Sequence, residues 1–425
     1  MKLVRTTGRG KSQGARILAR LENRGCSALE GAMPAVRRIV AGVRRSGNRA
    51  LERYAARFDG MKKASVLRVT PEEMAIAWES VEPALRDALA EAAAQIRGFA
   101  ERQMPASWGI SPASGLTTGQ LVRPLGSAGC YVPSGRHPLP STLLMTAIPA
   151  QVAGVPRIAV VSPNPAPATL AAAHHLGIME FYRVGGAHAV AALAYGTETI
   201  SRVDKIVGPG NLYVTAAKRL VAFDCAIDML AGPTEIMVVS DRGDPALIAS
   251  DIVAQAEHDP EALAVFITTC EELAKAVITE AKLRSRSNLV ARQALARNGV
   301  VIVAVNAGEA HEIANRIGPE HLTVDSASDL DWVQSAGSVF VGPWSAQPMG
   351  DYISGPNHTL PTGGLARARS GLSVNDFVKL ITVQEYGPRG VRTLGPSAAL
   401  LAEAEGLTAH AEAIRTRMTK GKTNG

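Results

Sequence analysis

A regular alternation of short apolar runs with helical patterns between residues 158 and 221 constrains the fold more than any other feature. The expected elements are strands at residues 158–161, 180–184 and 205–207 and helices at residues 166–176, 188–195 and 212–221. Successive strands that are joined by helices pair in parallel, and the helices cover both faces of the sheet. The sequence therefore predicts an α/β fold with a doubly wound, mainly parallel sheet.

A second set of the same kind follows residue 235. Its expected elements are strands at residues 236–240, 264–268, 300–305 and 338–341 and helices at residues 245–258, 271–282 and 307–317. The two sets share a layout but not a sequence. With 425 residues the chain is long for one hydrophobic core, so two or three domains are expected.

The composition of the remaining segments suggests where the domains begin and end. Residues 1–27 form a basic arm, and residues 28–130 together with 235–372 form the first α/β domain, beginning with N-terminal helices. Residues 131–234 form a second α/β domain inserted into the first, and residues 373–425 form a helical tail. The Pro- and Gly-rich stretch at residues 105–119 reads as a boundary.

Glu320 and His321 are the first candidates for chemistry. They follow Pro319, which ends a helix, and precede a short strand that starts near Leu322. A carboxylate beside an imidazole at such a junction can exchange protons with a substrate near neutral pH. The alternative is a solvated acid beside a capping histidine.

Gln255 and His258 stand three residues apart on an expected helix that begins at Pro245 behind the N-cap residue Asp244. They project from the same helical face. An imidazole nitrogen and an amide oxygen there make half of a metal site, and the alternative is ordinary hydrogen bonding.

A polar loop at residues 350–362 contains Asp351, Asn357 and His358 among many glycines and prolines. Long loops of this kind often carry binding groups, although a plain surface loop is the competing interpretation. Glu405 and His410 lie in the helical tail and, taken alone, read as solvated.

A glycine turn at residues 208–210 connects an expected strand to an expected helix. Backbone N–H groups at such a turn can bind a phosphate or a carboxylate. The usual G-x-G-x-x-G dinucleotide fingerprint does not follow any expected strand, so the turn alone is a weak signal.

The composition excludes several classes of protein. A net charge of +7 is spread over the chain and aromatic residues make up only 4%, which disfavours nucleic-acid binding. We see no secretory signal and no membrane-spanning run, so we expect a cytoplasmic protein. The four cysteines, Cys26, Cys130, Cys225 and Cys270, are far apart and read as buried apolar residues, with a catalytic thiol at Cys130 or Cys225 as the alternative.

Taken together, these stretches identify a resemblance to the histidinol dehydrogenase family over nearly the whole chain. The motifs are YVP at residues 131–133, YRVGGA at 182–187, VDKIVGPGN at 203–211, AGPTE at 231–235, QAEH at 255–258, PEHL at 319–322, NHTLPT at 357–362 and EGLTAH at 405–410. The resemblance implies two incomplete Rossmann-like domains. It also implies oxidation of L-histidinol to L-histidine by two successive NAD reductions, with one zinc ion per subunit.

The resemblance also assigns residues. The positions that match the family's zinc ligands are Gln255, His258, Asp351 and His410, and those that match its acid/base pair are Glu320 and His321. Substrate contacts carry over to Thr234, His358 and Glu405 in addition to the metal ligands and His321, and NAD contacts to Tyr131, His188 and Asn211. The family further implies a homodimer in which the tail of each chain completes the partner's site.

Three positions depart from the family pattern. Thr234 stands where Ser is usual and keeps the hydroxyl, His188 stands where Gln is usual, and Asp259 replaces a common Gly. None of these changes removes a predicted metal ligand or the acid/base pair. Two competing functions remain: a related zinc and NAD dehydrogenase for another polar alcohol such as a sulfonated diol, and a catalytically silent metal-binding relative.

Overall fold

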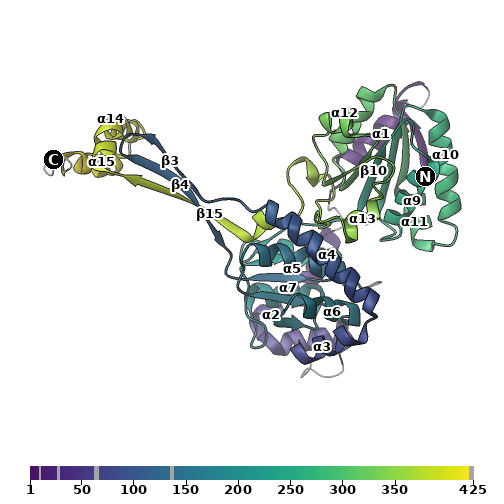
Figure 1. The fold of residues 1–425 in the computed structure, drawn as a ribbon, viewed down its shortest axis with the longest axis horizontal. Helices are drawn as coiled ribbons and strands as arrows, with labels where there is room; N and C mark the ends of the chain where they lie inside the picture. Colours follow the sequence, from purple (N-terminus) through teal and green to yellow (C-terminus); the bar gives the residue numbers. More distant parts are fainter. Residues whose placement is uncertain (9–10, 26–28, 62–66, 135–137, 421–425) are drawn as a thin grey trace. The chain divides into compact units, whose positions relative to one another are not determined.

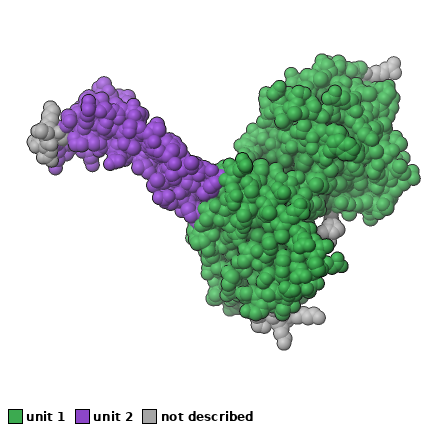
Figure 2. Space-filling model, in the orientation of Figure 1, with its two compact units in different colours: residues 1–103, 126–377 green, residues 104–125, 378–425 purple. Residues whose placement is uncertain are grey.

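The computed structural model describes residues 1–8, 11–25, 29–61, 67–134 and 138–420. The chain divides into two compact units, which Figure 2 colours separately. Unit 1 comprises residues 1–103 and 126–377, and unit 2 comprises residues 104–125 and 378–425. Unit 1 contains two six-stranded, mainly parallel sheets, which confirms the predicted α/β fold.

The first sheet has the strand order β1-β12-β11-β10-β13-β14, and all its strands are parallel. Its strands are β1 (Lys2–Arg5), β10 (Glu235–Val239), β11 (Leu263–Thr268), β12 (Gly299–Val303), β13 (His321–Val324) and β14 (Ser338–Val341). From β10 the chain moves outward to β11 and β12 and then returns to β13 on the other side of β10. The sheet therefore has a topological switch point between β10 and β13.

Helices cover both faces of the first sheet because successive strand residues point to opposite sides. Ile236 and Val238 share a core with α9 (Pro245–Ala256), α10 (Glu271–Arg284) and α11 (Leu289–Asn298). Met237 and Val239 pack with α1 (Lys11–Glu22) and α12 (Ala307–Ile317) on the opposite face. The central strands are consequently apolar along most of their length, as the apolar runs predicted.

The second sheet repeats the same strand order, as β2-β7-β6-β5-β8-β9. Its strands are β2 (Arg68–Val69), β5 (Ala128–Tyr131), β6 (Ile158–Val161), β7 (Glu180–Tyr182), β8 (Lys205–Val207) and β9 (Ala226–Ile227). Its helices are α2 (Leu29–Phe58), α3 (Pro71–Ser80), α4 (Pro83–Arg102), α5 (Pro140–Val152), α6 (Pro167–His175), α7 (Gly186–Tyr195) and α8 (Leu212–Val221). Only β2 runs antiparallel to its neighbour. The switch point of this sheet lies between β5 and β8.

The structure divides unit 1 differently from the predicted boundaries. Helix α2 packs into the core of the second sheet, whereas residues 28–130 were predicted to join the first. The predicted basic arm at residues 1–27 supplies β1 and α1 to the first sheet. Helical periodicity shows which face of a helix is apolar but not which sheet that face covers, so these assignments required the structure.

Unit 2 combines a small antiparallel sheet with two helices (Figure 1). The sheet has the order β15-β4-β3 and contains β3 (Trp108–Ala113), β4 (Leu116–Pro124) and β15 (Val378–Tyr386). The helices α14 (Pro388–Ala404) and α15 (Thr408–Lys420) confirm the helical end of the chain. The stretch read as a boundary at residues 105–119 instead contributes β3 and part of β4. Most of the predicted tail belongs to unit 2, where its strand β15 pairs with β4.

The remaining short elements lie between β13 and β15. They are the helix α13 (Gln347–Tyr352) and the 3₁₀ turns η3 (Ala327–Asp331), η4 (Leu365–Arg367) and η5 (Val374–Phe377). No helix within the described part of the chain is long and apolar enough to cross a membrane.

Gly208 occupies a position that only glycine tolerates. Its φ is 110°, and a Cβ placed there would overlap the carbonyl oxygen of Tyr131. Gly177 provides a matched control, because its φ is also positive, at 64°, but a Cβ there meets nothing within 4 Å. We expect Gly177→Ala to lower the free energy of unfolding by about 1 kcal/mol through backbone strain alone.

Gly208→Ala adds a backbone collision to that strain, so the expected loss is about 3 kcal/mol or more. Urea unfolding followed by far-UV circular dichroism measures both variants. Equal losses in the two variants would show that the close approach of Gly208 to Tyr131 does not constrain the fold.

Candidate functional site

The candidate site forms where β10 and β13 begin side by side. Ile236 is paired in register with His321, so Glu235 and Glu320 immediately precede the paired positions. The backbone N–H of Glu235 donates to Oε2 of Glu320 at 2.8 Å, and the hydroxyl of Thr234 donates to the same oxygen at 2.6 Å. The carbonyl oxygen of Glu235 lies 3.1 Å from Nδ1 of His321. One residue of β10 therefore contacts both predicted catalytic side chains through its main chain.

The side chain of Glu235 is anchored by Arg24. The guanidinium group binds both carboxylate oxygens, at 2.7 and 2.6 Å, and also donates to backbone carbonyls, including that of Ile317 at 2.8 Å. The N–H of Gly363 adds a further bond of 2.9 Å to Glu235. The side chains of Arg24 and Glu235 are only 15% and 4% exposed, so this is a largely buried bidentate pair.

Gln255 reaches the same site from the last turn of α9. Its side-chain nitrogen donates to the Thr234 hydroxyl and lies 3.4 Å from Nδ1 of His321. Its Oε1 is buried, and among the described residues it has no hydrogen-bond partner. Buried polar atoms are normally satisfied, so this oxygen is suited to a ligand. His258 follows on the exposed end of the helix and contributes to the electrostatic environment of Asp351 and His358.

Asp351 and His358 approach from α13 and the loop after it. Oδ1 of Asp351 lies 3.7 Å from Nε2 of His321, and Gln347 donates to its Oδ2 at 3.3 Å. His358 is held by its Nδ1, which lies 2.8 Å from the backbone oxygen of Asp351. Its Nε2 lies 3.4 Å from the hydroxyl of Thr142.

Burial and neighbouring charges shift the proton affinities of these groups. Burial raises the pKa of Glu320 to about 7. Burial alone would lower the pKa of His321, but the negative charges of Glu320 and Asp351 outweigh it and raise that pKa. For Asp351, burial acts upward, yet the protonated form of His321, whose Nε2 lies 3.7 Å from Oδ1, keeps the pKa low. Burial lowers the pKa of His358, which favours its neutral form. The acid and the imidazole at residues 320 and 321 are thus both set to exchange protons near neutral pH.

The three residues predicted to contact NAD lie at the carboxyl end of the second sheet. Tyr131 ends β5, and its buried hydroxyl accepts a bond of 3.0 Å from the N–H of Gly186. His188 is 1% exposed, and its Nε2 lies 2.7 Å from the Asp59 carboxylate. Asn211 caps α8 by accepting bonds from two backbone N–H groups. His188 is thus already engaged inside the protein, while the cofactor contacts of all three residues remain predictions.

Glu405 and His410 belong to unit 2 and are exposed there. Glu405 follows α14, and His410 lies in the first turn of α15. Nowhere in the described part of the chain do three His, Cys, Asp or Glu side chains come together as a metal site. Three of the four predicted zinc ligands lie in unit 1. Two of them are of the types just named, His258 and Asp351, and the third is Gln255.

Burial distinguishes a buried apolar role from a catalytic role for Cys130 and Cys225. It raises the pKa of the Cys130 thiol to about 12 and that of Cys225 to about 11. A reactive thiol needs a lowered pKa, so neither side chain suits a nucleophile. Cys270 is partly exposed, and Cys26 lies outside the described residues.

Sequence reasoning missed the residues that support the site. Arg24 belongs to a segment that was predicted to be a basic arm, and Asp59 directly follows α2, a helix assigned to the other domain. Gln347 and Thr142 contact predicted site residues from distant segments. These are contacts between segments far apart in the sequence, and no local pattern marked any of them.

Comparison with known proteins identifies relatives of the whole chain. A sequence model of the family described as histidinol dehydrogenase matches residues 22–418. The chain is 46% identical to histidinol dehydrogenase from Methanothermobacter thermautotrophicus, over 89% of this chain and 92% of that protein. It is also 46% identical to the Geobacillus kaustophilus enzyme, over 91% and 94% of the two chains. The crystal structure of histidinol dehydrogenase from Elizabethkingia anophelis superimposes with a TM-score of 0.93 and 34% identity, covering 100% of this chain and 99% of that one.

The proximity of Glu320 to His321 makes a direct prediction about proton affinity. Oε2 of Glu320 lies 3.6 Å from Nδ1 of His321, and its negative charge raises the pKa of the imidazole. Glu320→Gln removes that charge without changing the shape of the side chain, so the pKa of His321 should fall. A titration of labelled histidines by NMR in metal-free protein measures it.

The exposed Glu91 on α4 offers a matched control, and Glu91→Gln should leave the titration of His321 unchanged. An unchanged or higher pKa of His321 in Glu320→Gln would contradict the electrostatic coupling.

Proposed function

The chain belongs to the histidinol dehydrogenase family, and from this premise we propose that it oxidises L-histidinol to L-histidine by transferring two hydrides in succession to NAD. The observation that carries the proposal is the buried pair of Glu320 and His321, held side by side by the main chain of Glu235. An alcohol can be oxidised by hydride transfer only if its hydroxyl proton leaves as well. A base inside the site is therefore the first requirement of this chemistry.

His321 fits the role of the base. When its Nδ1–H donates to the carbonyl oxygen of Glu235, the lone pair is on Nε2, the atom that faces Asp351. In the first oxidation, Nε2 accepts the proton of the substrate hydroxyl while the carbon-bound hydrogen leaves as hydride to NAD, and an aldehyde forms. The negative charges of Glu320 and Asp351 stabilise the resulting imidazolium.

Glu320 fits the hydration step between the two oxidations. A water molecule must add to the aldehyde carbon before a second hydride can leave, and a base must accept one of its protons. The pKa of about 7 places this carboxylate where it can accept a proton and release it again at neutral pH. After His321 has released its first proton to solvent, it takes the remaining hydroxyl proton of the hydrate as the second hydride leaves to NAD, and the product is a carboxylate.

The residues present fit a zinc ion. The unpartnered Oε1 of Gln255, the carboxylate of Asp351 and the imidazole of His258 offer oxygen and nitrogen donors, which zinc accepts. His410 is proposed as the fourth ligand. When bound, zinc supplies a Lewis acid that polarises the substrate oxygen and orients the amino alcohol. His358, whose neutral form is favoured by burial, is proposed to contact the substrate, and Glu405 would contribute a charge from the tail.

We propose that NAD binds at the switch point of the second sheet. Tyr131 ends β5 and Asn211 begins α8, so both lie at the carboxyl ends of the two strands that flank the switch point. Crevices at such positions are the common ligand sites of doubly wound sheets. His188 orders this edge through Asp59, whose Oδ2 also accepts the N–H of Gly185 at 3.0 Å.

We further propose a homodimer in which each tail completes the partner's site. The division of the proposed zinc ligands between the two units supports it. Gln255, His258 and Asp351 belong to unit 1, whereas the fourth proposed ligand, His410, belongs to unit 2. Unit 2 also exposes large apolar side chains that a single chain leaves in water: Trp108, Ile110, Leu380, Ile381, Leu400 and Leu401. Exposed apolar surface of this extent is typical of an interface.

The first test is whether L-histidinol reduces NAD, and how many times. The proposal predicts two NADH formed per L-histidinol consumed, because the four electrons leave as two hydrides. Activity only with a sulfonated diol would support a related dehydrogenase with another substrate. No reduction of NAD by either alcohol would favour a catalytically silent relative.

Removal of the metal should abolish turnover. Dialysis against a chelator is expected to remove one zinc per subunit, measured by elemental analysis, and added zinc should restore the rate. Gln255→Ala should lower the zinc content, since it removes the unpartnered Oε1. Full turnover by protein that contains no metal would overturn the zinc assignment.

Hybrid dimers test whether the tail acts in trans. His321→Ala and His410→Ala are each expected to be inactive alone. If tails are exchanged, one site of the hybrid collects both lesions and the other is wild-type, so mixing and refolding restores up to about half of the activity per hybrid dimer. If each tail serves its own chain, every site carries one lesion and the mixture stays inactive.

A further inference from the structure

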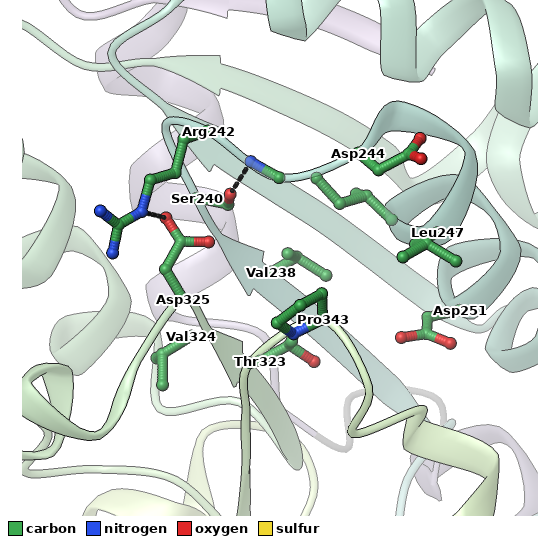
Figure 3. A pocket seen from close by; sticks show the side chains of 13 residues that line it. Val238, Ser240, Arg242, Asp244, Leu247, Asp251, Thr323, Val324, Asp325 and Pro343 are labelled. Carbon is green, nitrogen blue, oxygen red and sulfur yellow. Dashed lines mark hydrogen bonds and ion pairs between the residues drawn. The ribbon is translucent and has the colours of Figure 1, made fainter.

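A pocket of about 340 Å³ lies at the end of the first sheet opposite the candidate catalytic pair. Its walls come from the carboxyl ends of β10 and β13, the start of α9 and the turn after β14 (Figure 3). Glu320 and His321 stand at the start of β13, whereas Thr323, Val324 and Asp325 line the pocket at its end. The pocket is therefore separate from the proposed oxidation site.

The position of the pocket in the topology points to a ligand. The two sheets share one strand order, so the β10–β13 switch point of the first corresponds to the β5–β8 switch point of the second. Doubly wound sheets bind small molecules in the crevice outside the carboxyl ends of the strands at this point. The volume also falls within the range of small-molecule sites. This crevice has no part in the proposed reaction.

The charges around the pocket select the kind of ligand. Arg242 is the single cationic side chain among the residues that line it, and it lies 3.8 Å from Asp325 (Figure 3). Asp244 accepts a bond of 2.7 Å from Ala246 and caps α9. Asp251 lies one helical turn beyond Leu247 on the pocket wall, and burial raises its pKa to about 6. Within the described structure, the influences on Asp251 are burial and a backbone hydrogen bond from Gln347, with no cation among them.

A phosphate group does not fit these surroundings. Two N–H groups at the start of α9 that could hold one are already used, because Gly243 donates to Ser240 and Ala246 donates to Asp244. Three carboxylates against one guanidinium give the lining an excess of negative charge. Val238, Leu247, Ile248, Val324 and Pro343 supply an apolar wall.

We propose that this pocket binds a small organic cation, with an ammonium group against Asp251 and an apolar body against Val238, Ile248 and Val324. The proposal is independent of the oxidation chemistry, since it concerns the other end of the strands. Asp251 is half-buried, and a carboxylate that is partly withdrawn from water without a cation is destabilised, so a cationic ligand offsets that cost. The hydroxyl of Ser240 lies within the same lining and can bond a polar group on the ligand.

The experiment compares three probes that share a benzene ring: benzylamine, benzyl alcohol and benzoate. Methyl-labelled full-length protein at pH 8 is titrated with each and followed by NMR. Benzylamine should shift the methyl signals of Val238, Leu247, Ile248 and Val324, and benzyl alcohol should bind about tenfold more weakly or not at all. Benzoate should not bind. Shifts confined to other methyl groups, or equal affinity for the three probes, would overturn the proposal.

Two variants with opposite expected effects complete the test. Asp251→Asn preserves the shape of the side chain and should weaken benzylamine binding about tenfold, whereas Arg242→Gln removes the competing cation and should strengthen it. Arg242 is 75% exposed, so its replacement leaves the fold intact. Asp87→Asn on the exposed side of α4 is the matched control and should change nothing. Unchanged binding in Asp251→Asn, or tighter binding of adenosine monophosphate than of benzylamine, would contradict the assignment.

Discussion

The candidate site depends on the main chain of Glu235. Its N–H group holds the carboxylate of Glu320 and its carbonyl oxygen holds the imidazole of His321, so a single peptide segment orients both groups. A buried carboxylate and a buried imidazole are costly unless they are hydrogen-bonded, and these contacts supply the partners. The side chain of Glu235 is in turn gripped by Arg24. A continuous chain of contacts therefore connects Arg24, Glu235 and the pair at residues 320–321, although these residues lie far apart in the sequence.

The parallel pairing of β10 with β13 explains why this arrangement is possible. In a parallel pair the two strands start at the same end of the sheet, so residues 234–235 and 320–321 meet at the amino ends of β10 and β13. The last turn of α9 returns to that end and brings Gln255 beside them. The opposite end of the same sheet carries the pocket near Asp251, and the carboxyl end of the second sheet carries Tyr131 and Asn211. One duplicated topology thus creates the separate places where we propose that ligands bind.

Much of the fold could be predicted because its signals are local. The strands at residues 158–161, 205–207 and 338–341 and the helices at 212–221 and 307–317 have the predicted bounds. The helix at residues 307–317 ends where predicted because Gly318, which follows it, adopts a left-handed conformation with φ of 58°. The antiparallel sheet of unit 2 was missed, since β3 is largely exposed, β4 is mostly half-buried, and neither strand has a clean apolar alternation.

The site was predictable in part. Glu320 and His321 are neighbours in the sequence, and Gln255 and His258 share a helical face, so each pair could be proposed from spacing alone. That Gln255 lies beside His321 follows from pairing between strands, which spacing does not reveal. The contact of His188 with Asp59 needed a helix that had been assigned to the other domain. Roles in zinc and NAD binding came from family resemblance, and they remain proposals.

The tautomer of His321 tests the account most directly, because the proposed base is Nε2 and its partner on the other side is the carbonyl of Glu235. The measurement is the pair of ¹⁵N chemical shifts of the His321 ring, at a pH above the point where the imidazole loses its proton. The account predicts a protonated Nδ1 that donates to Glu235 and a bare Nε2 that faces Asp351. A proton on Nε2 with a bare Nδ1 would contradict it, because the ring would then turn its basic nitrogen away from Asp351 and from the proposed substrate.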